Sequence, residues 1–71
     1  VMERYEVFRI RQAVDALPEK QRLVFILSQY GDLRYSQISE LLGIPEGTVK
    51  SRMATAVEAL RKALEGSSPS L

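Results

Sequence analysis

Six consecutive residues, Gly47 to Arg52, combine side chains suited to binding an anionic or hydrogen-bonding surface. Lys50 and Arg52 are cationic donors, and Thr48 and Ser51 carry hydroxyl groups that donate or accept. Gly47 allows a close approach of the backbone to a ligand, although glycine in a helix costs roughly 1 kcal/mol against alanine. A purely structural helix has no use for that glycine. The run therefore favours a binding role.

The composition excludes most catalytic chemistry. The 71 residues include neither cysteine nor histidine, which removes disulfides, thiol nucleophiles, the usual zinc sites and histidine general bases. We expect no enzymatic activity, metal, cofactor or small-molecule substrate, because no nucleophile has a base and no paired carboxylates converge. The net charge of +1 leaves a nucleic-acid partner open. No apolar run approaches the roughly 20 residues of a membrane-spanning helix, so we expect no membrane partner.

The elements that must position these side chains are four helices. Apolar spacing and the glycine and proline positions predict them at about residues 2–16, 18–30, 35–42 and from Pro45 or Glu46 to about Leu64. Pro18 is expected as the first residue of the second helix and Gly31 as a left-handed cap at its end. The fold class is all-α, with one domain over residues 1–65 and a disordered tail over 66–71.

Apolar positions predict which face of each helix is buried. On the last helix they form one stripe, which comprises Val49, Met53, Ala56, Leu60 and Leu64. On the first helix they are Val7, Ile10, Ala13, Val14 and Leu17, widened by Tyr5 and Phe8. On the second they are Leu23, Ile26, Leu27 and Tyr30, extended by Val24, and on the third they are Ile38, Leu41 and Leu42. Phe25 lies off its stripe, so the second helix is expected to be contacted on more than one side.

The third helix, a tight turn at Gly43 and the last helix make a predicted helix-turn-helix. Ser36 has the better capping side chain for the third helix, but a Leu33–Ile38 hydrophobic staple favours Arg34 as the cap residue. The helical wheel places Gly47, Lys50, Ser51, Ala54 and Glu58 opposite the buried stripe, with Thr55 on the flank. This outer face is free to enter a DNA major groove. A plain helical bundle fits the apolar spacing equally well, and the Gly47–Arg52 run favours the DNA-binding interpretation.

The stretch from Leu17-Pro18-Glu19 through Gly47-Thr48-Val49-Lys50-Ser51-Arg52 resembles region four of bacterial RNA polymerase sigma factors, the extracytoplasmic-function type above all. The resemblance covers about residues 10–64. It implies a cytoplasmic bacterial protein that recognises the −35 promoter element with its last helix and docks on the flap of the polymerase β subunit. It also implies sequestration by an anti-sigma protein.

The resemblance carries roles onto individual residues. The positions that face the groove to read bases are Lys50, Ser51, Ala54 and Thr55. The geometry of a helix-turn-helix and the positions at the start of the last helix assign a further set to phosphates, which comprises Arg34, Gln37, Gly47, Thr48 and Arg52. A structural ion pair, with Glu40 for example, is an equal alternative for Arg52, and a capping role is compatible for Thr48. The polymerase flap is expected on a surface around Leu23, Val24, Phe25 and Leu27, a segment that core packing explains as well.

The chain also departs from the family pattern. Arg34 replaces a small capping residue, and Ser39 replaces an alanine at the helix crossing, which is tolerable if its hydroxyl bonds back to the helix. The arginines that often follow the Lys-Ser-Arg motif are missing, and Val57 is apolar at the edge of the stripe. Two rival functions therefore stay open: a sigma-like decoy that binds an anti-sigma protein without DNA, and the output domain of a response regulator.

Overall fold

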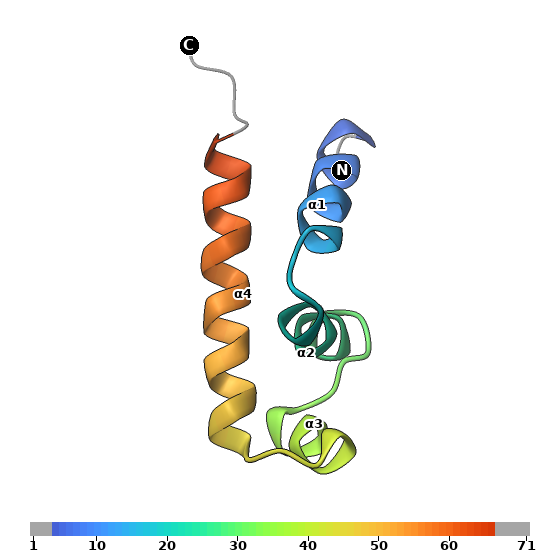
Figure 1. Cartoon of the computed structure of the whole chain (residues 1–71). Coiled ribbons are helices and arrows are strands. Elements are labelled where there is room, and N and C mark those ends of the chain that lie inside the picture. The colour runs from blue at the N-terminus through green and yellow to red at the C-terminus, as the bar shows by residue number, and fades with distance from the viewer. Residues whose placement is uncertain (1–3, 67–71) are drawn as a thin grey trace.

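The computed structural model describes residues 4–66, and within that range it contains four helices. They are α1 (Arg4–Asp15), α2 (Glu19–Gln29), α3 (Tyr35–Leu42) and α4 (Glu46–Gly66). Helix α4 runs along one side of the molecule, and α1, α2 and α3 follow one another along the other side (Figure 1). The all-α, four-helix prediction is confirmed. Gly66 belongs to α4, while the remainder of the predicted tail, 67–71, lies outside the described residues.

The core consists of two clusters arranged along α4. The first joins α1 and its C-terminal end to the second half of α4, and its buried members are Val14, Leu17, Ala56 and Leu60. The second joins α2 and α3 to the first half of α4, and its buried members are Val24, Ile38, Val49 and Met53. Phe25 packs against both clusters, which confirms that α2 is contacted on more than one side.

The predicted stripe of α4 is confirmed by burial. Four of its members, Val49, Met53, Ala56 and Leu60, are at most 8% exposed, and Leu64 is half-buried. Because one rigid helix supplies half of each cluster, the position of α4 is fixed from its first turn to its last. Its outer face is fixed with it.

The predicted stripe of α2 is wrong. The fully buried residue is Val24, whereas Leu23, Ile26 and Tyr30 are 43%, 37% and 64% exposed. Five consecutive residues of this short helix are apolar and point to all of its sides, so their spacing does not define which side is buried. Helix α2 therefore leaves a row of apolar side chains uncovered.

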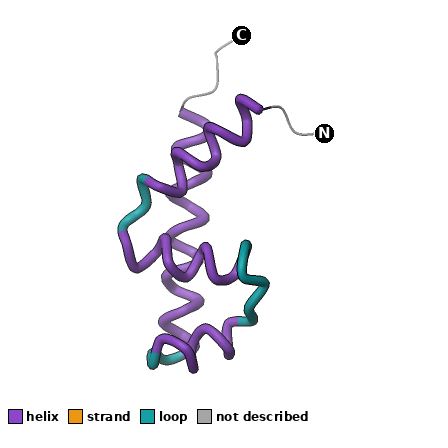
Figure 2. The backbone as a smooth tube through the Cα atoms, turned by 90° about the vertical axis from the view of Figure 1, so that its right-hand side faces the viewer, coloured by secondary structure: helices purple, strands orange, loops and turns teal. Residues whose placement is uncertain are grey.

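Four further residues predicted on the buried faces are also exposed. Leu41 on α3 is 63% exposed, because the inward face of that helix is set by Ile38 and Leu42 on either side of it. On α1, Val7 is 41% exposed and lies outside the buried face, and Tyr5 and Phe8, at 65% and 56% exposed, do not widen it. The N-terminal half of α1 lies beside the end of α4 in both backbone views (Figures 1 and 2).

Both ends of α2 differ from the prediction. Pro18 is the N-cap residue, with φ −55° and ψ 147°, and the helix begins at Glu19. At the other end the left-handed residue is Asp32, with φ 58°, not Gly31. Gly31 is needed for space, because a Cβ there would lie 2.8 Å from the carbonyl oxygen of Leu27. That carbonyl accepts a hydrogen bond from the Leu33 N–H at 3.1 Å, which closes the turn.

None of the helices within residues 4–66 is long and apolar enough to cross a membrane.

Candidate nucleic-acid interface

The α3–turn–α4 unit is held together at its turn. Gly43 adopts the left-handed conformation, with φ 68°, and its N–H donates to the Ser39 carbonyl at 2.9 Å. The Ser39 hydroxyl donates to the carbonyl oxygen of Ile44. The condition for tolerating Ser39, a bond from its hydroxyl back to the helix, is therefore not met, because the hydroxyl bonds forward to the turn. The turn fixes the angle at which α4 leaves α3.

The outer face of α4 is open over its first three turns. Its exposed residues include Gly47, Lys50, Ser51, Ala54 and Thr55. All four predicted base-reading residues are therefore accessible to solvent. Their contacts with bases stay a prediction.

Gly47 has no steric reason to be a glycine. A Cβ at this position would meet no atom within 4 Å, and the backbone φ is not in the left-handed region. The fold would therefore accept alanine, which is the better helix former. This supports the interpretation that Gly47 serves a ligand outside the chain.

Thr55 is constrained by a bond within α4. Its hydroxyl donates to the carbonyl oxygen of Ser51, one turn earlier, at 3.1 Å. A hydroxyl group has a single hydrogen, so this bond occupies the donor capacity of Thr55.

The entry to α3 supplies the predicted phosphate contacts Arg34 and Gln37. Arg34 is the N-cap residue, as the Leu33–Ile38 staple predicted, and Leu33 packs in the same cluster as Ile38. The cap itself comes from Gln37, whose Oε1 accepts from the Arg34 N–H at 2.8 Å. An arginine side chain has no acceptor. Both side chains are exposed, and the amide NH₂ of Gln37 remains as the group that can donate to a phosphate.

The remaining predicted phosphate contacts, Thr48 and Arg52, are half-buried at the start of α4. Among the described residues Arg52 forms no ion pair, with Glu40 or with another carboxylate, so that alternative for Arg52 is wrong. The guanidinium group of Arg52 is available to a phosphate at the edge of the outer face.

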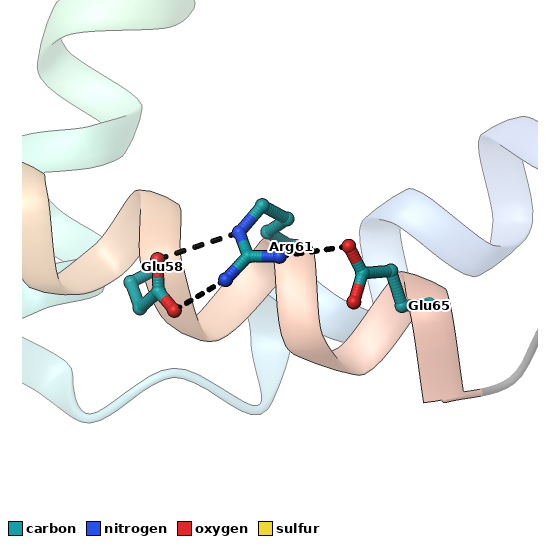
Figure 3. Close-up of polar contacts among 3 residues, drawn as sticks. All are labelled: Glu58, Arg61 and Glu65. Carbon is teal, nitrogen blue, oxygen red and sulfur yellow. Dashed lines mark hydrogen bonds and ion pairs between the residues drawn. The ribbon is translucent and has the colours of Figure 1, made fainter.

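Beyond Thr55, the outer face of α4 carries paired charges. Arg61 donates to Glu58 at 2.6 Å and to Glu65 at 2.8 Å, which links three exposed side chains along the helix (Figure 3). The hydrogen bonds and the positive charge of Arg61 lower the pKa of Glu58 below its ordinary value of 4.5. This ladder contains two carboxylates and one cation, so it is unsuited to DNA phosphates.

The predicted polymerase-docking residues separate into core and surface. Val24 is fully buried and cannot contact a partner without unfolding, so its assignment is wrong. Phe25 and Leu27 are half-buried and pack in the core clusters. Leu23 alone of the four is exposed. The exposed apolar surface continues from Leu23 to a groove of about 410 Å³ between α1 and α2, lined by Val7, Arg11, Val14, Asp15, Ile26 and Tyr30.

Two arginines hold the helices together and were missed by sequence reasoning. Arg22 donates through Nη1 to the carbonyls of Asp15 and Leu17, both at 3.1 Å, and so satisfies the end of α1. Arg9 donates through Nη2 to the Leu64 carbonyl at 2.7 Å, and its guanidinium lies 5.7 Å from the ring centre of Tyr5. Nothing local predicts the Arg9 contact, because the partners are 55 residues apart.

A compact α3–turn–α4 unit with an exposed, hydrogen-bonding outer face defines a helix-turn-helix domain of the DNA-binding class. Residues 8–60 match the family "Sigma-70, region 4". The chain belongs to this family, whose members are regulatory domains and not enzymes.

Curated relatives agree with that assignment. The chain is 46% identical over 55 residues to the ECF RNA polymerase sigma factor SigW of Bacillus subtilis, which covers 78% of this chain and 29% of SigW. It is 37% identical over 59 residues to SigK of Mycobacterium ulcerans, covering 83% of this chain and 32% of that protein. It is also 37% identical over 54 residues to RpoE of Cereibacter sphaeroides, covering 76% and 30% respectively. The chain thus spans about a third of the length of the curated relatives it matches.

Proposed function

We propose that this domain recognises the −35 element of promoters for a bacterial sigma factor and docks on the flap of the RNA polymerase β subunit in the cytoplasm. The outer face of α4 enters the major groove, with Lys50 and Ser51 directed at base edges. Arg34, Gln37, Thr48 and Arg52 bind phosphates on either side and fix the register. The output domain of a response regulator is disfavoured by the sigma-factor family match.

The observation that carries this proposal is the contrast between the buried and the exposed face of α4. One face is buried from Val49 to Leu60, and the opposite face is exposed and polar at its start. Gly47 lies at that start and has no steric role within the chain. A helix packed on one side only, with its N-terminal turns accessible, has the geometry of a recognition helix.

The polymerase flap docks, in this proposal, on the exposed apolar surface of α2 around Leu23, Ile26 and Tyr30. These side chains flank the groove between α1 and α2. Neighbouring apolar side chains that stay exposed on a small domain are typical of a protein-binding surface. The surface belongs to α1 and α2, whereas the reading residues belong to α4.

The test separates the two surfaces. The double variant K50A/S51A is expected to lose promoter binding in anisotropy titrations while keeping its flap binding and its thermal unfolding temperature. Both side chains are exposed, and exposed substitutions change stability by about 0.5 kcal/mol or less. The variant L23A/I26A is expected to show the reverse pattern, with flap binding reduced and DNA binding kept.

A matched control uses the exposed lysine of α2. Lys20→Ala removes one exposed positive charge, as Lys50→Ala does, but on α2 beside Leu23 and Ile26. Equal loss of DNA affinity in K20A and K50A would mean that net charge, not a reading face, governs binding. Loss of flap binding in K50A/S51A would contradict the separation of the surfaces.

A second candidate function is a decoy that binds an anti-sigma protein and no DNA. It is favoured by Val57 and Leu41, which are 49% and 63% exposed near the helix-turn-helix. It is also favoured by the missing arginines after Arg52. The two functions predict opposite results for promoter titrations of the unmodified chain with polymerase present.

A further inference from the structure

We propose that Thr55 reads DNA through its methyl group, and that with Ala54 it selects a thymine in the recognised element. This inference rests on the proposed function and specifies the chemistry of the base that the second turn of the reading face contacts.

The hydrogen bond of Thr55 is the first step. Its hydroxyl hydrogen is directed to the Ser51 carbonyl at 3.1 Å, within α4. The side chain therefore has no hydrogen to donate to a base acceptor, such as guanine O6 or N7 or adenine N7. What Thr55 offers outward as a binding group is its methyl, together with the acceptor lone pairs of the hydroxyl oxygen.

The neighbourhood of Thr55 is the second step. Ala54 is also exposed and lines the same surface as Thr55, so two methyl groups are available on this turn of the outer face. A shallow surface around them is lined by Ala54, Thr55, Glu58, Ala59 and Lys62, and it is mainly apolar. The carboxylate of Glu58 is engaged by Arg61 at 2.6 Å, so the nearest acidic group is already paired.

The chemistry of the major groove gives the third step. Thymine is the base that presents a methyl group there, and alanine and threonine methyls are its apolar partners. Lys50 and Ser51 lie one turn earlier, where both can donate to guanine and Ser51 can also accept from an amino group. The proposal therefore places a base that hydrogen-bonds to Lys50 or Ser51 at one turn of the outer face of α4, and a thymine at the next turn.

The experiment begins with selection from a random DNA library, using the 71-residue chain at low salt. An element with a thymine is expected to be enriched. That thymine is then replaced by deoxyuridine, which removes only the methyl group. Loss of one buried methyl is expected to weaken binding about three- to fivefold.

A matched pair of variants assigns the contact to an atom. Thr55→Val keeps the methyl and removes the hydroxyl, and it is expected to keep the preference for thymine over deoxyuridine. Thr55→Ser keeps the hydroxyl and removes the methyl, and its preference for thymine over deoxyuridine is expected to be reduced to what the Ala54 methyl alone supplies. Circular dichroism melts check that both variants are folded.

The outcomes distinguish the two levels of the proposal. Enrichment of no element would overturn the proposed function and this inference with it. An enriched element that tolerates deoxyuridine at every thymine would overturn the inference alone. Retained discrimination in Thr55→Ser with loss in Thr55→Val would also overturn it, because the hydroxyl would then be the reading group.

Discussion

The fold gives no reason for a glycine at position 47, whereas the close approach of a DNA ligand does. The Cβ position of Gly47 is empty and its backbone is not left-handed. Gly43, four residues earlier, differs because its φ of 68° is one that side chains rarely adopt. Gly43 is therefore explained by the turn, and Gly47 by the ligand.

Gly47→Ala is expected to raise the free energy of unfolding by up to about 1 kcal/mol, because alanine is the better helix former. The same variant is expected to weaken promoter binding, because its methyl group obstructs close approach of the DNA. Chemical denaturation and anisotropy on one preparation measure both quantities. Gly43→Ala is the control and is expected to lose roughly 1–2 kcal/mol of stability. Unchanged DNA affinity in Gly47→Ala would contradict the role given to this glycine.

Glu58 gives the molecule a pH dependence at acid pH. Arg61 lowers its pKa in the folded state, so the ion pair stabilises the fold above the ordinary value of 4.5. This contribution is lost as the pH falls through the lowered pKa and the carboxyl is protonated in both states. Glu58→Gln is expected to be less stable at pH 7, with the difference from the unmodified chain narrowing below pH 4.5. Thermal melts at both pH values test this, and a gap that widens in acid would contradict it.

At the scale of the helix, Phe25 matters because α2 contributes to both core clusters through it. Phe25→Ala is expected to cost about 3 kcal/mol, the lower end for a phenylalanine because the ring is only half-buried. Both halves of the molecule are expected to melt together. Hydrogen exchange would measure whether amides near Ala56 and near Val49 lose protection equally. Protection lost around one cluster only would refute the linking role.

The helices differ in how far sequence predicts them. The 21 residues of α4 give a clear periodicity, and its buried stripe and exposed face are as predicted. The 11 residues of α2 include five consecutive apolar side chains, so packing alone decides that Val24 is inward. The same ambiguity put Val24 in the docking surface.

The turn after α2 and the two arginines that link helices show a second limit of sequence reasoning. A glycine after a helix predicts a left-handed cap, but here Gly31 provides space for a carbonyl and Asp32 takes the positive φ. Arg9 and Arg22 read as ordinary surface cations, and their roles depend on which helix ends meet in space. Of the candidate site, exposure of the reading face followed from local periodicity, whereas the Thr55 bond required the side-chain geometry.

For the whole molecule, a net charge of +1 makes DNA affinity dependent on a few local cations. Ala54→Arg adds one cation to the exposed outer face without touching the buried stripe. If it neutralises one phosphate, the salt dependence of binding is expected to steepen by roughly 0.9 log units per log unit of salt. Titrations across a salt series measure the slope. An unchanged slope, together with impaired binding of an anti-sigma protein, would favour the decoy function.

The single long helix also makes the molecule a lever. The 21 residues of α4 extend about 30 Å at 1.5 Å per residue, and Arg9 of α1 holds the far end through Leu64. Because the two core clusters fix α4 to the other helices, a tilt of the whole domain by about 5° about that end displaces the first turns by roughly 2.5 Å over that length. Good hydrogen bonds tolerate only about 0.5 Å. A protein that grips α1 and α2 can therefore align or misalign the reading residues in the groove without touching them.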